Sequence, residues 1–399
     1  MKEKKILFLG AAPTQLPPIK YAKEKGYYVI TCDYLPENPG HSLADEWHNV
    51  STTDQDAVLD LAKKLNIDGI VAYASDPAAP TAAYVSEKLG LVGNPYNSVL
   101  TLSRKDLFRK FLADNCFNVP ESKSFDCLNE AETWVKSIAF PIFVKPVDSS
   151  GSKGVTKIED RAQLPKAFAH ALEFSRSKQV VVEQAIERVG YQVDSDIFMI
   201  DGKVAFWVWG DQHQDKHCHP YVPVGISFPS VLSQNVQEEA IKEIEKILQA
   251  LCYKNGAFNV EFVVDEIGKV WVIEIGPRNG GNLIPEVIKY ATGVDMIEMT
   301  VESALGHEIA LPIKSQKLGF WSSYIIHARK DGWYKGIQIS ERAEKCIVEK
   351  EVRVKQGEFV NKFSGSHDTL GTMILKFNSQ QEMLEMLDNM EQDIKVEIA

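Results

Sequence analysis

The stretch KPVDSSGSKGV, from Lys145 to Val155, follows the apolar run Phe140 to Val144 and combines small residues with two lysines and two glycines. A Walker A loop needs the spacing G-x-x-x-x-G-K-[ST] at the start of a helix, and this stretch lacks it. Lys153 precedes Gly154, and the residues VTKIED that follow favour a strand. The stretch therefore predicts a hairpin tip. Such a tip either holds phosphate oxygens with backbone N–H groups or is an ordinary surface hairpin.

Other charged residues stand at the ends of predicted buried strands near this stretch. Lys145 ends the strand before the loop, and Glu183 ends a later strand, QVVVEQ. A buried charge needs a partner, because removing it from water is costly. Lys105 lies on the preceding amphipathic helix, SRKDLFRKFLADN, for which Ser103 is the expected N-cap. These charged companions favour the phosphate-binding interpretation.

Two carboxylates interrupt neighbouring apolar runs further along the chain. Glu261 lies in FNVEFVV and Glu274 in VWVIEIG, and a turn links the two predicted strands. Buried carboxylates must be paired, protonated or bound to a metal. Neither strand contains a lysine, so the two carboxylates fit a Mg2+ site. The alternative is a structural ion pair with Arg278.

The N-terminal third alternates strands and helices. We expect strands at Lys5–Leu9, Tyr27–Asp33 and GIVAYAS from Gly69, separated by helices at about 16–25 and 54–65 and followed by one at about 78–89. This order predicts a parallel, doubly wound sheet. The first turn reads GAAPTQLPP rather than G-x-G-x-x-G, so we do not expect a dinucleotide site with Asp33 as the ribose ligand.

The bulk properties limit the class of protein. The chain has 399 residues, which predicts two or three domains, and a net charge of -11, which argues against binding to nucleic acid or an anionic membrane. Its six cysteines are scattered, and no apolar stretch reaches spanning length. The start, MKEKKILFLGAAPTQ, indicates a first strand rather than a signal peptide. We therefore expect a cytoplasmic protein.

Four segments occur in an order that resembles the ATP-grasp superfamily: SRKDLFRKFL, FPIFVKPVDSSGSKGV, VVVEQAI, and FNVEFVVD with VWVIEIGPRNGG. The resemblance covers about Lys5 to Gly306 and is strongest to amino-acid and peptide ligases related to carbamoyl-phosphate synthase and the purine-pathway ligases. It implies an α/β and α+β multidomain protein with the nucleotide between two antiparallel-type sheets. The implied domains are a Rossmann-like one at 1–103, an ATP-grasp domain at 104–311 with its lid at 104–185, and an α+β region at 312–399 that ends in a helix.

The resemblance also implies roles for individual residues. Arg278 and Lys145 would be catalytic, and Glu261 and Glu274 would hold Mg2+, or Mn2+ in its place. Glu183 would accept from the adenine amino group, and the flap would close over the phosphates. The implied ATP contacts are Lys105, Lys145, Ser149, Ser150, Gly151, Ser152, Gly154, Glu183, Gln184, Ala185, Ile186 and Gln192.

Two positions depart from the family pattern. The second metal strand often carries Glu-x-Asn, and here Gly276 stands in the Asn position. Asn279 or water would then supply the missing oxygen. The ribose-binding acid is replaced by Gln192, with Glu187 and Asp194 nearby, so the sequence leaves the ribose contact open.

The region from Phe206 to Gly225 is expected to contact the substrate. Trp209, Asp211 and His213 would share one strand face with Trp207, as the wall of a pocket or as a solvated strand end with buried tryptophans. Arg278, Asn279 and Gly280 would bind a substrate carboxylate. Ser75 and Asp76 end a parallel strand, where they would contact substrate or cap a helix. The spacing of His213, His217, Cys218 and His219 does not match a zinc site.

The function implied is an ATP-dependent ligase that activates a carboxylate as an acyl-phosphate and joins it to an amine. The alternatives are an enzyme that activates bicarbonate or another small acid, and an ATP-binding regulatory protein without turnover. Retention of Lys105, Lys145, Glu183, Glu261 and Glu274 argues against the last. The expected partners are small carboxylate and amine substrates, with no nucleic acid and no membrane, and a homodimer is the assembly that relatives suggest.

Overall fold

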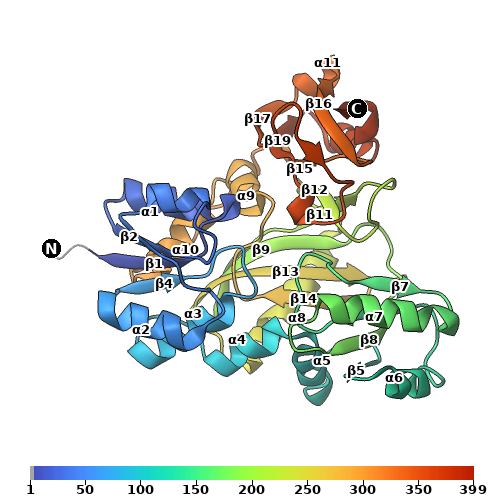
Figure 1. Ribbon diagram of the computed structural model, residues 1–399, viewed down its shortest axis with the longest axis horizontal. Helices are drawn as coiled ribbons and strands as arrows, with labels where there is room; N and C mark the ends of the chain where they lie inside the picture. The colour runs from blue at the N-terminus through green and yellow to red at the C-terminus, as the bar shows by residue number, and fades with distance from the viewer. Residues whose placement is uncertain (1–3) are drawn as a thin grey trace.

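The computed structural model describes residues 4–399, so the first three residues of the basic start lie outside it. Three lobes surround a central sheet (Figure 1). The N-terminal lobe is blue, the lid is green and the C-terminal lobe is red. Short 3-10 helices at Pro13–Gln15, Pro39–Leu43, Arg161–Gln163, Ser366–Asp368 and Met390–Gln392 lie between the longer elements.

The first lobe contains the predicted parallel sheet. Its strand order is β3-β2-β1-β4, and every neighbouring pair is parallel. The strands are β1 (Lys5–Leu9), β2 (Tyr28–Cys32), β3 (Glu46–His48) and β4 (Gly69–Val71), and the helices are α1 (Leu16–Glu24), α2 (Gln55–Leu65), α3 (Ala79–Leu89) and α4 (Tyr96–Ser103). The sequence interpretation missed β3 and α4. It was also wrong about Ser103, which ends α4, while Arg104 stands at the N-cap of α5 (Lys105–Asp114).

The lid is a four-stranded antiparallel sheet with the order β5-β8-β6-β7. Its strands are β5 (Ser122–Phe125), β6 (Ile142–Pro146), β7 (Thr156–Ile158) and β8 (Val180–Gln184), and its helices are α6 (Leu128–Trp134) and α7 (Leu164–Phe174). Apolar side chains of both helices and of the strands form one core cluster. β6 pairs with β7 in register Ile142↔Ile158, so the opening stretch forms a hairpin connection, as predicted.

The central sheet has nine strands, with the path β14-β13-β9-β11-β12-β15-β19-β17 and with β10 paired to β9. Its first part consists of β9 (Val193–Ile200), β10 (Lys203–Trp207), β11 (Gly210–Gln214), β12 (Pro223–Phe228), β13 (Gly256–Val264) and β14 (Val270–Gly276). α8 (Gln234–Ala250) packs against one face in a large apolar cluster, and α9 (Ile284–Thr292) contributes to a cluster with other strands of the sheet. α10 (Met296–Ala304) contacts both the first lobe and β13.

The C-terminal residues extend this same sheet. β15 (Phe320–Ile326), β17 (Ile347–Val352) and β19 (Gly371–Phe377) continue it beyond β12, so the expected boundary at residue 311 does not separate two sheets. A three-stranded sheet contains β16 (Gly332–Ile339), β18 (Phe359–Val360) and β20 (Ile394–Ile398), beside α11 (Glu341–Glu344) and α12 (Gln380–Leu387). The predicted last helix is present, but the chain ends in β20. Among residues 4–399, no helix combines the length and the apolar character needed to cross a bilayer.

Candidate active site

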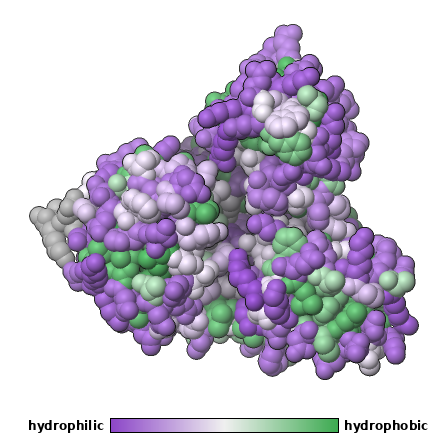
Figure 2. Space-filling view, in the orientation of Figure 1, coloured by the Kyte–Doolittle hydropathy of each residue, from purple (hydrophilic) through white to green (hydrophobic). Residues whose placement is uncertain are grey.

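The lid and the central sheet face each other across the charged residues singled out from the sequence. Figure 2 shows a hollow where the three lobes meet, with mainly hydrophilic residues around it. Lys105, at the start of α5, joins the two sides: its Nζ lies 3.2 Å from Glu274 Oε2 on β14 and donates to the Ser149 carbonyl at 2.9 Å. Its backbone N–H donates to the Val147 carbonyl at 2.8 Å. The helix, the flap and the metal-candidate strand therefore meet at one lysine.

Lys145 and Glu183 form a buried ion pair, which gives Lys145 the partner that a charge at the end of a buried strand needs. Lys145 Nζ donates to Glu183 Oε1, and Arg109 Nε on α5 donates to Oε2 of the same carboxylate at 2.8 Å. Burial alone would raise the pKa of Glu183, but Arg109 and Lys145 hold that pKa well below its usual range. Both carboxylate oxygens of Glu183 already have cationic partners. The contact that Glu183 makes in this structure therefore holds Lys145 in place. Its contact with the adenine amino group stays a prediction.

The flap connects β6 to β7 and rests on the central sheet's long loop. Ser152 Oγ donates to the Tyr221 carbonyl at 2.7 Å. Gly151, Ser152 and Gly154 have φ values of 64°, 57° and 74°, a left-handed region that favours glycine. A Cβ on Gly154 would also lie 3.0 Å from Phe174 Cβ, so a side chain has no room there.

The end of β8 and the residue after it are tied to the rest of the lid by their backbone. The Gln184 N–H donates to the Glu121 carbonyl at 2.9 Å, and the Ala185 N–H donates to the Pro141 carbonyl at 3.0 Å. These bonds fix the path of the chain towards Ile186, which like Gln184 is one of the residues expected to contact ATP.

Three carboxylates lie in one row across adjacent strands. Asp194 on β9 is the register partner of Glu261 on β13, and Glu261 is the register partner of Glu274 on β14. Directly opposed residues of antiparallel strands point to the same face. Burial, followed by repulsion from Asp194 and Glu274, raises the pKa of Glu261 to about 8, and burial raises the pKa of Asp194 to about 6. Such crowded oxygens fit a divalent cation such as Mg2+.

The sequence missed Asp194 as a member of this row, although the strand alternation contained the signal. Gln192, the candidate ribose contact, donates from Nε2 to Glu261 Oε2 at 2.6 Å and thus lies beside the carboxylates. Gln212 on β11 donates to Asp194 Oδ2 at 3.1 Å and faces the same site.

A second row lies beside the first. It consists of Asp196 on β9, Asn259 on β13 and Gly276 on β14, which are register partners in turn. Asn259 Nδ2 donates to Asp194 at 2.7 Å and to Asp196 at 3.2 Å, which links the two rows. Burial raises the pKa of Asp196 to about 7.

Asp196 holds the loop that follows β14. Its carboxylate accepts from the Gly280 N–H at 2.8 Å and from Asn279 Nδ2 at 3.1 Å. Asn279 Oδ1 in turn accepts from Thr300 Oγ1 at 2.8 Å. Asn279 and Gly280, both predicted substrate contacts, are therefore fixed by side chains of other elements. Asn279 makes these contacts rather than replacing an Asn at position 276.

Arg278 pairs with the first lobe rather than with the metal-candidate carboxylates. Its Nη2 donates to Asp76 Oδ2 at 2.6 Å, and its Nη1 donates to Asn259 Oδ1 at 3.1 Å. Within residues 4–399, no ion pair joins Arg278 to Glu261 or Glu274. The alternative interpretation of those carboxylates as its partners was wrong.

The side chains predicted to form a pocket wall, Trp209, Asp211 and His213, are buried inside the protein. Trp209 is 1% exposed, packs edge-on against Phe262 and belongs to the core beneath α8. Asp211 accepts from Ser230 Oγ at 2.6 Å. His213 lies 2.9 Å from both Asp388 and Ser227. On β11, Asp211 and His213 point to one face, and Gln212 on the opposite face meets the carboxylate row.

Near this loop, three possible metal ligands lie close together, but they already have partners within the protein. Asp215, Cys218 and His327 offer ligand atoms within 4.8 Å. However, Asp215 Oδ2 accepts from Arg329 Nε at 2.6 Å and lies 2.9 Å from His327 Nε2. A cation at this place would be repelled by the arginine.

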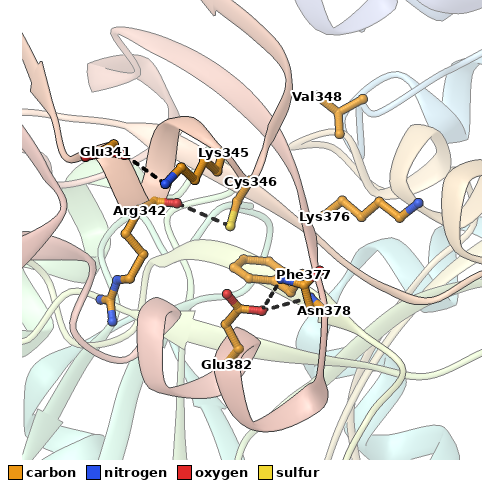
Figure 3. Close-up of a pocket in the computed structure, with 9 residues that line it drawn as sticks. All are labelled: Glu341, Arg342, Lys345, Cys346, Val348, Lys376, Phe377, Asn378 and Glu382. Carbon is orange, nitrogen blue, oxygen red and sulfur yellow. Dashed lines mark hydrogen bonds and ion pairs between the residues drawn. The ribbon is translucent and has the colours of Figure 1, made fainter.

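Two cavities lie outside the carboxylate rows. The first, of about 690 Å³, is lined by residues of α11, β17, β19 and α12 (Figure 3). Two of its cations, Arg342 and Lys345, are paired with Asp393 and Glu341. The second, of about 120 Å³, lies between α3 of the first lobe and the Arg278 loop.

Residues 104–311 match the family model described as carbamoyl-phosphate synthase L chain, ATP binding domain. This chain belongs to that ATP-grasp family. The ATP-grasp family consists of ATP-dependent ligases, and its members typically bind ATP together with Mg2+.

Individual relatives are distant. The chain is 28% identical over 302 residues to the uncharacterized protein y4rH of Sinorhizobium fredii, a match that covers 74% of this chain and 61% of that protein. It is 28% identical over 245 residues to the carbamoyl phosphate synthase large chain of a Thermoanaerobacter species, covering 60% of this chain and 22% of that one. The chain therefore spans less than two thirds of the length of either relative.

Solved structures show the same architecture over the whole chain. The L-amino acid ligase of Bacillus licheniformis superposes with a TM-score of 0.85 at 20% identity, covering 100% of both chains. At this identity the likeness shows the ATP-grasp fold and leaves the substrate open.

Proposed function

We propose that this ATP-grasp protein uses ATP to convert a carboxylate into an acyl-phosphate and then joins the acyl group to an amine, releasing ADP and phosphate. The observation that carries the proposal is the row Asp194, Glu261 and Glu274, which faces Lys105 and the flap. A row of acids opposite lysines holds a polyphosphate with its cation, and Arg278 lies over the neighbouring row, bonded to Asn259. The whole-chain likeness to an amino acid ligase supports an amine as the acceptor.

The lid residues bind the nucleotide in this proposal. Lys105 and Lys145 neutralise phosphate oxygens, and the backbone N–H groups of the flap from Ser149 to Gly154 donate to them. Glu183, which Arg109 fixes by its own hydrogen bond, holds Lys145 in place. Mg2+, held by Glu261 and Glu274, supplies positive charge at the phosphates when bound. Gln192 stays the candidate for the ribose.

The chemistry begins with the substrate acid. A carboxylate oxygen attacks the terminal phosphorus of ATP, the bond from that phosphorus to the bridging oxygen breaks, and ADP leaves with the electron pair. Lys145 and Arg278 stabilise the charge that develops on the transferred group. The amine then attacks the carbonyl carbon, phosphate leaves, and the amine loses a proton to form the amide.

Besides binding phosphate oxygens, the flap excludes water from the reacting groups. An acyl-phosphate hydrolyses in contact with solvent, so closure protects it until the amine attacks. Ser152, bonded to the Tyr221 carbonyl, and Lys105, bonded to the Ser149 carbonyl, hold the flap against the central sheet.

A substrate screen tests the proposal. Purified protein with ATP and Mg2+ is mixed with pairs of amino acids, other carboxylic acids and amines, with bicarbonate and formate as separate arms, and phosphate release is followed. We expect release that needs an acid and an amine together, with ADP as the nucleotide product, and that Glu274→Gln abolishes. Release driven by bicarbonate alone, or AMP and pyrophosphate as products, would contradict the proposed reaction.

A further inference from the structure

Asp76 reaches the candidate site from another part of the chain. It follows β4 of the first lobe, two residues after Ala74, which has a φ of 51°. Alanine rarely adopts this left-handed conformation, so the surrounding structure must enforce the turn. The turn carries Asp76 to Arg278, with 16% and 11% of the two side chains exposed. A strained backbone position thus precedes a largely buried ion pair between lobes.

Arg278 is held from several directions, but one of its three nitrogens has no hydrogen-bond partner in the described structure. Asp76 accepts from Nη2 at 2.6 Å, and the Asn259 side chain and the Asn279 carbonyl accept from Nη1 at 3.1 and 3.0 Å. The buried Nε has no hydrogen-bond partner among residues 4–399. Buried donors are nearly always satisfied, so an unpaired one beside a candidate site is available for a contact with a bound ligand. Nε, with the second N–H of Nη2, is therefore left to donate to an anion.

Gly276 makes room for this pair. It shares a face of β14 with Glu274, two residues before it, and pairs in register with Asn259. A Cβ at Gly276 would lie 3.0 Å from Arg278 Cζ and 3.1 Å from Asp76 Oδ1. These distances are tighter than ordinary contacts. The absence of a side chain at position 276 therefore lets the guanidinium lie over the second row.

We propose that Asp76 is a positioning residue that sets the catalytic guanidinium of Arg278 from the first lobe, and that Gly276 is the space this arrangement needs. The inference rests on the proposed function, in which Arg278 contacts the transferred phosphoryl group. Asp76 does not touch the nucleotide itself. It orients Arg278 so that Nε faces the terminal phosphate, and the site is complete only when the first lobe is docked.

The test compares the binding of two nucleotides by isothermal titration calorimetry. MgADP lacks the terminal phosphate, and the magnesium complex of AMP-PNP, a non-hydrolysable ATP analogue, has it. We expect Arg278→Ala and Asp76→Ala each to weaken AMP-PNP binding by about tenfold or more, as for loss of a charge-assisted hydrogen bond, with much less change for ADP. Asp76→Asn should lie between wild type and Asp76→Ala. Gly276→Ala should repeat the selective loss although it removes no charge.

Glu302→Gln is the matched control for the lobe interface. Glu302 on α10 accepts from Tyr21 and Tyr27 of the first lobe at 2.8 and 2.9 Å, and it does not contact Arg278. We expect this variant to bind both nucleotides as the wild type does. A similar loss for both nucleotides in Asp76→Ala would show that Asp76 only stabilises the interface and would overturn the inference.

Two further results separate this inference from the proposed function. If Asp76→Ala and Gly276→Ala bind AMP-PNP like the wild type while Arg278→Ala does not, Arg278 needs no positioning from Asp76, and the inference is wrong although ATP use stands. If the wild-type protein binds neither nucleotide, the proposed ATP-dependent function fails, and with it the role of Arg278.

Discussion

At the scale of single residues, the site contains buried charges, and oppositely charged neighbours offset the cost of removing them from water. Glu183 is 2% exposed and shares its carboxylate between Lys145 and Arg109. Removing the acid would leave two buried cations without neutralisation, which costs far more than losing an exposed pair. The carboxylate row has the opposite imbalance, since Asp194, Glu261 and Glu274 crowd negative charge.

Glu183→Gln should destabilise the fold strongly. We expect a loss of about 3 to 5 kcal/mol in the free energy of unfolding, measured by urea denaturation, because Lys145 and Arg109 lose their common partner. Asp114→Asn is the matched control: Asp114 pairs with Lys110 on the surface of α5, and its loss should cost less than about 1 kcal/mol. Equal midpoints for the two variants would contradict this account of the pair.

The carboxylate row predicts a particular dependence of stability on pH and Mg2+. Because the pKa of Glu261 is raised from 4.5 to about 8, the stability linked to it is present below pH 4.5 and is lost as the pH rises through about 8. Mg2+ replaces the missing protons, so the increase in melting temperature on adding MgCl2 should be larger near pH 9 than near pH 6. Thermal denaturation measures it. In Glu261→Gln the pH dependence of the Mg2+ effect should shrink.

Several site residues could be predicted singly, but their partners could not. Glu261 and Glu274 stood out because each interrupts an apolar run. Asp194, Asp196 and Gln212 lie in polar segments where several side chains look equally suitable. Strand alternation alone could not tell which face of β11 meets the site, because polar residues occupy both faces. The role of Arg109 was not predicted, because its position in an amphipathic helix suggested that it lies on the solvent-exposed face.

At the scale of elements, the flap hairpin links the lid to the central sheet. β6 and β7 are short, and the connection between them has three positions with a positive φ: Gly151, Ser152 and Gly154. The sequence predicted the hairpin from the order of lysine and glycine. It did not predict that the tip rests on the loop at Tyr221, because that contact joins residues 69 positions apart.

Gly154→Ala should impair flap closure through a steric clash, in addition to the backbone strain of alanine at a positive φ. The new Cβ would meet Phe174 and Pro146 at 3.0 and 3.1 Å, at a φ of 74°. Gly268→Ala is the control, since Gly268 has a φ of 82° with nothing near its missing Cβ. Both variants should lose about 1 kcal/mol of stability from strain. Only Gly154→Ala should lose the protection of the flap from limited proteolysis that magnesium AMP-PNP gives the wild type.

Element prediction failed where local composition was weak. β12 was not predicted, and β11 was expected only as part of the alternating face from Trp207 to His213, because the segment contains glycine, proline and many polar residues. They form because β9 and β15 supply partners on either side. α9 and α10 were missed for a similar reason: they follow a glycine-rich loop and are stabilised by packing on the sheet.

At the scale of the whole molecule, the three lobes are joined by shared structure rather than by linkers alone. β15, β17 and β19 of the C-terminal residues extend the central sheet, and Asp76 of the first lobe completes the surroundings of Arg278. The parallel first domain and the nucleotide-binding fold were predictable from strand order and motifs. The continuity of the sheet across residue 311 was not, because it depends on pairing between distant strands.

A chain truncated after residue 311 should not fold into a stable protein. It would lose β15, leaving β12 as an unpaired edge, and would expose the apolar residues of the C-terminal cluster such as Val224. We expect aggregation, or a broad thermal transition in calorimetry, where the full chain shows a sharp one. A soluble fragment 1–311 with a sharp transition would contradict the structural unity of the central sheet.

The central claim is that the carboxylate attacks ATP, and isotope transfer tests it most directly. Once the substrate screen identifies an active pair, the acid is supplied with 18O in its carboxylate, and the phosphate released is examined by mass spectrometry. The oxygen that attacks phosphorus stays with it when the amine displaces the phosphate. We predict one 18O atom in each phosphate released. Phosphate without 18O, in a reaction that forms the amide, would contradict the acyl-phosphate mechanism.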